Sequence, residues 1–320
     1  MEYIKLGKSD LSVSKICLGC MSFGDPNTNF LDWTLNPEQS EEIIKHSLDL
    51  GINFFDTANT YSKGTSEEYL GRAIKNNVQR DKVILASKVY FNEGGLSKDA
   101  ILREIEGSLK NLGTDYLDLY IIHRFDYDTP MEEYMETLHN LVKSGKVRAL
   151  GASAMYGYQF QNLQNIAKDN GLTQFVSMQN HYNTLYREDE RELIPVCKQY
   201  DVSLTPYSPL AAGRLSRTQW KTDTLRSQTD TMAIRKYDST QEADYQIVLR
   251  VDELAKKYNV SMTQIALAWQ FAKGVASPVI GATKLKYIDD AVGSINVKLT
   301  DEDILYLDEL YVPHKISGAR

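Results

Sequence analysis

The sequence predicts an α/β fold, a (β/α)8 TIM barrel with an N-terminal β-hairpin and a C-terminal extension that fills residues 1–320 as one domain. Short apolar runs rich in Ile, Val, Leu and Phe alternate with amphipathic segments, a rhythm typical of βαβ units around a parallel sheet. Eight such runs occur, and six of the seven intervals between their ends span about 27 to 36 residues, enough for one strand and one helix. Eight strand–helix units in about 300 residues fit such a barrel.

The predicted strands are these eight apolar runs. They cover residues 15–20, 52–56, 83–88, 117–123, 147–153, 175–180, 202–208 and 277–282. Helical periodicity predicts helices over 37–50, 66–75, 97–112 and 130–143, with Ser97 and Thr129 as expected N-caps. A doubly wound sheet is the alternative, but the sequence holds no GxGxxG or GxxxxGK loop, which favours the barrel.

Two segments lie outside this rhythm. Residues 2–6 and 11–15 flank the turn signal at 7–10 and predict a hairpin that could plug the N-terminal end of the barrel. Residues 211–240 are polar, rich in Thr and Arg, and weakly periodic. A long irregular segment after the seventh strand predicts a lid.

Composition excludes several classes of protein. The chain has 36 basic and 43 acidic residues and a net charge of −7, which argues against non-specific nucleic-acid binding. No apolar run approaches the roughly 18 residues of a membrane span, and the N-terminus lacks the apolar segment of a signal peptide, so a cytoplasmic location is expected. Cys17 and Cys20 form a CxxC spacing without a second pair, and the histidines show no metal-ligand spacing, which predicts no metal site.

Several apolar runs end in a reactive or hydrogen-bonding side chain. In a barrel the catalytic groups lie at the carboxyl ends of the strands. A lone buried charge is costly, so Asp56 and Lys88 are expected to face one another. The full set of strand-end residues is Asp56, Lys88, His123, Ser153, Gln179 with Asn180, and Tyr207 with Ser208.

The sequence also resembles a known family. The segments that carry the resemblance are GCMSFG at 19–24, FFDTANTY at 54–61, ASK at 86–88, IIHRFD at 121–126, GASA at 151–154, MQN at 178–180, YSPLAAGRL at 207–215 and PVIGATK at 278–284. Together, and in order over essentially the whole chain, they are similar to the aldo-keto reductase family. The resemblance implies an oxidoreductase that reduces aldehydes, ketones or sugars to alcohols with NADPH.

That resemblance assigns four catalytic residues. Tyr61 would donate the proton to the substrate carbonyl, and His123 would donate a hydrogen bond to the carbonyl oxygen. Lys88 would lower the pKa of Tyr61, because a nearby ammonium favours the phenolate. Asp56 would keep Lys88 charged and oriented.

The resemblance also assigns a cofactor site. Tyr207 would stack on the nicotinamide ring, Ser153 and Gln179 would bind its carboxamide, and the segment from Ser208 to Arg214 would surround the pyrophosphate. Thr283 and Lys284, joined by Arg226, could hold the 2′-phosphate at a helix N-terminus, which favours NADP over NAD. The set is Met21, Asp56, Ser153, Gln179, Tyr207, Ser208, Pro209, Leu210, Ala211, Gly213, Arg214, Arg226, Gly281, Thr283, Lys284, Tyr287, Asp290 and Ala291.

Three positions depart from the family pattern. Ala154 stands where Asn is common, and Tyr287 and Ala291 stand where Gln and Asn often contact the adenine. These differences question the affinity for the cofactor more than the chemistry, since all four catalytic residues are present.

The substrate and two alternative functions stay open at this point. The expected partner is a small carbonyl compound, in a pocket walled by Trp33, Tyr90, Phe91, Phe125, Tyr127 and Tyr156. Arg124 could attract an anionic substrate, but pairing with a nearby Asp or Glu is the favoured expectation. The alternatives are an NADPH-binding regulatory module, like the potassium-channel β subunits related to this family, and a Schiff-base lyase using Lys88. The oligomeric state is not predicted.

Overall fold

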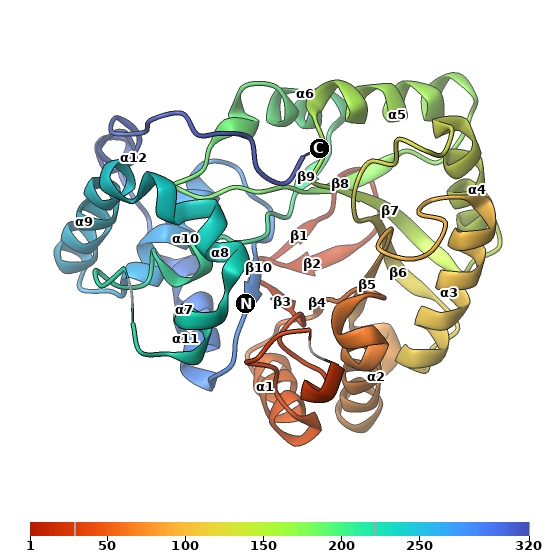
Figure 1. Cartoon of the computed structure of the whole chain (residues 1–320), viewed down its shortest axis with the longest axis horizontal. Coiled ribbons are helices and arrows are strands. Elements are labelled where there is room, and N and C mark those ends of the chain that lie inside the picture. The colour runs from red at the N-terminus through yellow and green to blue at the C-terminus, as the bar shows by residue number, and fades with distance from the viewer. Residues whose placement is uncertain (29, 221, 320) are drawn as a thin grey trace.

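The fold is a ring of parallel strands surrounded by helices (Figure 1). The computed structural model describes residues 1–28, 30–220 and 222–319. The parallel sheet has eight strands in the order β10-β3-β4-β5-β6-β7-β8-β9. They are β3 (Cys17–Gly19), β4 (Phe54–Asp56), β5 (Ile84–Val89), β6 (Leu117–Ile122), β7 (Val147–Ser153), β8 (Phe175–Gln179), β9 (Ser203–Leu204) and β10 (Val279–Gly281).

Backbone hydrogen bonds close this sheet into a barrel. The amide of Ala276 donates to the carbonyl of Leu204 at 3.0 Å, and that of Val279 donates to Pro206 at 2.9 Å. These bonds join β10 and the residues just before it to β9 and the residues just after it. The predicted (β/α)8 barrel is therefore confirmed, and all eight predicted runs contribute a strand to it. The run at 202–208 forms a strand of only two residues, because Pro206 has no amide to extend the ladder.

The outer helices occupy the intervals between the strands. They are α1 (Pro37–Asp49), α2 (Thr65–Asn77), α3 (Lys98–Leu112), α4 (Met131–Lys143), α5 (Gly157–Asp169), α6 (Leu193–Tyr200), α9 (Gln241–Tyr258), α10 (Met262–Ala272), α11 (Leu285–Gly293) and α12 (Asp301–Asp308). Ser97 caps α3 by accepting from the amide of Ala100. The expected cap at Thr129 is wrong: α4 begins after Pro130, and the Thr129 hydroxyl donates to the Asp126 carboxylate instead.

The N-terminal hairpin fills one end of the barrel. Strands β1 (Tyr3–Lys5) and β2 (Ser12–Ser14) pair antiparallel, as predicted. Leu6, Leu11 and Val13 are fully buried in one cluster with side chains of the barrel interior. Phe54 and Ile84 in that cluster are the first residues of their strands, so the hairpin plugs the N-terminal end and leaves the opposite end for chemistry.

The long segment after β9 is more regular than expected. It contains the short helices α7 (Leu225–Thr229) and α8 (Thr231–Tyr237), which correct the expectation of an irregular loop over 211–240; Lys221 lies outside the described residues. Capping side chains explain these helices, because Thr224 and Asp230 accept from the amides of Ser227 and Ala233.

The C-terminal tail returns to the mouth of the barrel, beside β9 (Figure 1). The amide of Ser317 donates to the Tyr186 hydroxyl at 2.8 Å, and His314 is paired with Asp244 at 2.9 Å. Across 1–28, 30–220 and 222–319, none of the helices has both the length and the apolar character required to span a bilayer.

The plug predicts a measurable contribution to stability. Leu11→Ala should lower the free energy of unfolding by about 3 kcal/mol, because it leaves a cavity in a fully buried cluster. Urea denaturation followed by circular dichroism measures this. Ile4→Ala, on the 36% exposed side chain of the same hairpin, is the matched control and should cost less than about 1 kcal/mol. Equal losses in the two variants would contradict the plug.

Candidate active site

A fully buried ion pair lies at the carboxyl ends of β4 and β5. The Lys88 Nζ is 2.5 Å from Oδ2 of Asp56 and also donates to the carbonyl of Thr57 at 2.7 Å and to the Tyr61 hydroxyl at 3.3 Å. An ammonium has three hydrogens, so each has an acceptor. Burial opposes the charged form of Lys88, but the Asp56 carboxylate and Tyr61 raise its pKa above the usual range.

The second oxygen of Asp56 is held from across the barrel. The Gln179 side-chain amide, at the end of β8, donates to Oδ1 of Asp56 at 2.8 Å. The Ser153 hydroxyl, at the end of β7, donates to the backbone carbonyl of Gln179 at 2.8 Å. Residues of four strands therefore hold the Asp56 carboxylate and the Lys88 ammonium in place. The side-chain amide of Gln179, which was expected to bind the cofactor, already donates to Asp56 in this network.

Tyr61 lies in a tight turn directly above the ion pair. Ser62 and Lys63, which follow it, both adopt left-handed backbone conformations. Burial raises the pKa of Tyr61, while the Lys88 ammonium acts in the opposite direction. Lys88 therefore acts on the pKa of Tyr61 in the expected direction, but desolvation of the phenolate outweighs the ammonium and the pKa is raised. The phenol is protonated at neutral pH and can act as a proton donor.

His123 lies beside Tyr61 and is neutral. It follows β6, is 8% exposed, and its ring packs edge-on against that of Tyr61 with centroids 5.9 Å apart. Burial, with the charges of Lys88 and Arg124, lowers the pKa of His123 well below its usual range. A neutral imidazole can donate one hydrogen bond without bringing a charge. The structure thus gathers all four predicted catalytic side chains into one site.

Tyr207 presents an aromatic ring at the same end of the barrel. His181 stacks on it with centroids 5.2 Å apart and an interplanar angle of 11°. The ammonium of Lys236, on α8, lies over the ring at 4.7 Å from its centroid. Neither residue could be identified from the sequence, because their contacts with Tyr207 depend on how the chain after β8 and α8 return to the barrel.

The segment after Tyr207 is held in an unusual backbone conformation. Ser208, Ala211 and Ala212 all have positive φ angles, of 53°, 47° and 54°. This region costs a non-glycine residue about 1 kcal/mol, and such strain is concentrated at binding loops and active sites. Amides of Ala211 and Gly213 donate to the carbonyls of Ser208 and Leu210, which makes the segment a compact double turn that includes Pro209.

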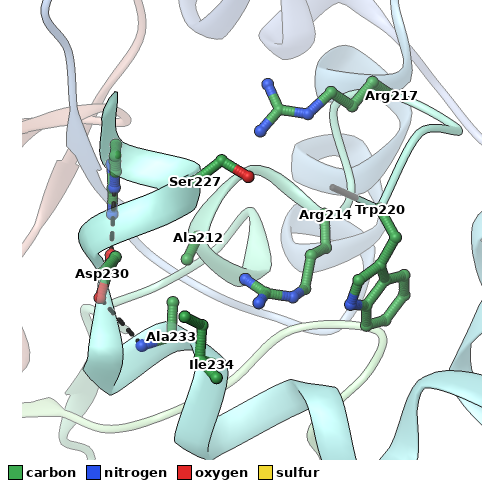
Figure 2. A pocket seen from close by; sticks show the side chains of 9 residues that line it. Ala212, Arg214, Arg217, Trp220, Ser227, Asp230, Ala233 and Ile234 are labelled. Atoms are coloured by element: carbon green, nitrogen blue, oxygen red, sulfur yellow. Dashed lines mark hydrogen bonds and ion pairs between the residues drawn. The ribbon is translucent and has the colours of Figure 1, made fainter. Parts of the chain in front are cut away.

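Three arginines surround a small pocket between this segment and the helices α7 and α8 (Figure 2). Arg214 binds Asp238 at 2.5 Å, and Arg226 binds Asp230 at 3.2 Å. The Nε of Arg217 is buried and has no hydrogen-bond partner within the described part of the chain. Arg217 was not among the cofactor residues predicted from the sequence. Its position three residues after Arg214 was the available signal.

The remaining predicted cofactor residues lie on two further segments. Gly281 ends β10, and Thr283 and Lys284 precede α11, with Lys284 exposed at its N-cap. Tyr287 is exposed on α11, Asp290 is partly buried, and Ala291 is fully buried in the core. Met21 follows β3 and is 37% exposed.

The aromatic residues expected to wall the substrate pocket do not all lie together. The ring of Phe91 packs edge-on against His123 at 4.9 Å, and Phe125 packs against Tyr127 at 4.9 Å. Trp33 contacts the guanidinium of Arg226 instead.

All three cysteines are buried, and burial raises the pKa of each thiol, as expected for structural residues.

The ion pair predicts strong energetic coupling. Asp56→Asn and Lys88→Met should each lower the free energy of unfolding by about 3 kcal/mol, because each leaves a buried charge without its partner. The double variant should lose at least about 1 kcal/mol less than the sum of the two singles. Urea denaturation of all four proteins measures this cycle. Additive losses would contradict a direct interaction.

Comparisons with known proteins agree with this geometry. The family model described as "Aldo/keto reductase family" matches residues 15–312. Versiconal hemiacetal acetate reductase of Aspergillus parasiticus is 44% identical over 99% of this chain and 98% of its own. An aldo-keto reductase of Fusarium vanettenii is 41% identical over 99% and 93%.

A solved structure gives the same answer. The crystal structure of the thermostable aldo-keto reductase Tm1743 with the inhibitor epalrestat has a TM-score of 0.78 and 27% identity, covering 97% of this chain and 100% of that one. With a family model over nearly the whole chain and relatives above 40% identity, the chain belongs to the aldo/keto reductase family, oxidoreductases that act on carbonyl compounds.

Proposed function

We propose that this protein reduces aldehydes, ketones or sugars to alcohols with NADPH, and that Tyr61 is the proton donor. The observation that carries the proposal is the contact of Lys88 with the Tyr61 hydroxyl at 3.3 Å, in a site where Lys88 is also bound to Asp56. When bound, NADPH supplies the hydride to the carbonyl carbon. Tyr61 supplies the proton to the carbonyl oxygen.

The protein groups account for the movement of charge. His123 is neutral and donates a hydrogen bond to the carbonyl oxygen, where negative charge develops. Tyr61 starts as a phenol and becomes a phenolate when its proton leaves. The adjacent Lys88 ammonium stabilises that phenolate more than the phenol, so it lowers the barrier to proton transfer.

Several features support a dinucleotide next to these groups. Tyr207 offers an aromatic face, and its hydroxyl is buried without a hydrogen-bond partner in the described chain. The strained segment from Ser208 to Gly213 and the unpartnered Nε of Arg217 fit a phosphate. Thr283 and Lys284 at the start of α11 fit a further phosphate, which supports NADPH over NADH.

The two alternative functions have weaker support. A Schiff-base lyase needs a neutral, accessible lysine, whereas Lys88 is fully buried and its pKa is raised. A purely regulatory module would not need a complete set of proton donor, ammonium, carboxylate and imidazole. These observations favour the reductase.

Replacing the proton donor tests the proposal. Tyr61→Phe should lower kcat/KM for NADPH-dependent reduction by about 1,000-fold, because general acid catalysis contributes on that order. NADPH oxidation over a panel of aldehydes, ketones and sugars measures this. NADPH binding, followed by quenching of protein fluorescence, should change less than about threefold. Reduction that survives in Tyr61→Phe would rule out this tyrosine as the donor.

The choice of cofactor is tested separately. Lys284→Met should weaken NADPH binding by about tenfold and leave NADH binding nearly unchanged, because it removes one charge-assisted contact to the 2′-phosphate. The neighbouring exposed Lys286→Met is the matched control for loss of charge. An equal effect on both cofactors would show that Lys284 does not recognise the 2′-phosphate.

A further inference from the structure

Arg124 is a cation without a carboxylate partner at the mouth of the barrel. It directly follows His123, donates to the backbone carbonyl of His123 at 3.0 Å, and lies 5.6 Å from the ring centroid of Phe91. Over the described residues, no acidic oxygen approaches it within 4.0 Å, so the expected pairing with a nearby acid is wrong. The nearby Asp126 instead accepts hydrogen bonds from the amides of Leu96 and Asp128 and from a threonine hydroxyl.

Lys236 is a second such cation, carried by α8. Its ammonium lies 4.7 Å from the ring centroid of Tyr207, and it too has no acidic oxygen within 4.0 Å in the part of the chain that is described. Asp230, at the start of the same helix, is occupied: one oxygen binds Arg226 and the other accepts from the amide of Ala233.

Each cation lies over an aromatic ring of the site, Arg124 over Phe91, which packs against His123, and Lys236 over Tyr207. Burial and the charge of Arg124 lower the pKa of Lys236 to about 8, with Asp230 opposing them. The charge of Arg124 also acts on the pKa values of Tyr61, His123 and Tyr207. Two partly buried like charges repel one another, and a bound anion would reduce that cost.

We propose that this enzyme acts on carbonyl compounds that carry an anionic group, and that Arg124 and Lys236 bind that group. The inference rests on the proposed reductase function and specifies its substrate class. The position of Arg124 favours a substrate anion over a cofactor phosphate. It lies with Phe91 on the segments that follow β5 and β6, beside His123, whereas the proposed phosphate contacts follow β9 and β10. Lys236 also follows β9, but its ammonium lies over the Tyr207 ring and does not line the arginine pocket proposed for the phosphate. A carboxylate or a phosphate ester would satisfy both cations.

Equilibrium binding tests this without turnover. Benzoate and benzamide have nearly the same shape but differ in charge, and calorimetry measures their binding to the NADP⁺-loaded protein. The wild type should bind benzoate at least about tenfold more tightly than benzamide, and Arg124→Gln and Lys236→Gln should each lose most of that preference. Arg124→Lys, which keeps the charge, should retain a preference.

Arg235→Gln is the matched control, because Arg235 is an exposed cation next to Lys236 and should leave the preference intact. Phenyl phosphate in place of benzoate tells a phosphate ester from a carboxylate as the preferred anion. Equal binding of benzoate and benzamide by the wild type would overturn the inference. It would also be overturned if the two Gln variants weakened NADPH binding but kept the benzoate preference.

Turnover separates this inference from the proposed function. The ratio of kcat/KM for 4-carboxybenzaldehyde to that for 4-formylbenzamide should fall at least about tenfold in Arg124→Gln. If the wild type reduces both aldehydes but shows no preference in binding, only the anionic substrate class is wrong. If it binds benzoate selectively but oxidises NADPH with no carbonyl compound, the anion site stands and the proposed reduction is wrong.

Discussion

The buried ion pair between Lys88 and Asp56 is the interaction on which the rest of the site depends. A fully buried ammonium is tolerated only when every hydrogen has an acceptor, and here these are Asp56, Thr57 and Tyr61. The acceptors come from β4 and from the turn that follows it. Gln179 of β8, across the barrel, donates a hydrogen bond to the second carboxylate oxygen of Asp56. In the parallel register of β4 and β5, Asp56 lies opposite Ala86, two residues before Lys88, so both side chains come to the same end of the barrel.

The side chains around this pair differ in their charge state. Lys88 is the charged group beneath the reaction site, while Tyr61 and His123 beside it are both neutral because burial opposes their ionised forms. Negative charge that develops on a carbonyl oxygen would then meet one fixed ammonium and two neutral donors. Arg124 and Lys236 add positive charge at the mouth of the barrel, where the proposed anionic substituent of the substrate would bind.

The barrel and the meeting of Asp56, Lys88 and His123 at one end could be predicted because both depend on local patterns, whereas Tyr61 was assigned by the family resemblance. Apolar runs ending in Asp56, Lys88 and His123 recur at a regular interval, and parallel strands bring such ends together. The pKa of Tyr61 could not be predicted, since its direction depends on whether burial or Lys88 has the larger effect. Lys236 and His181 were missed because their contacts with Tyr207 depend on how distant segments fold back. The isolation of Arg124 was also hidden, because Asp126 stands nearby in sequence yet binds backbone amides instead.

The charge of Lys88 is the central claim, and NMR of the protein labelled with ¹⁵N at lysine Nζ measures it most directly. Loss of one signal in Lys88→Met assigns the resonance, and the signal is then followed from pH 6 to about pH 11, beyond the usual lysine pKa. Because the Asp56 carboxylate and Tyr61 raise the pKa of Lys88, its signal should stay that of an ammonium after the exposed lysines have begun to titrate. A Lys88 signal that becomes that of a neutral amine below about pH 9 would contradict the account. It would remove the fixed positive charge from beneath Tyr61 and bring back the nucleophilic lysine of the lyase alternative.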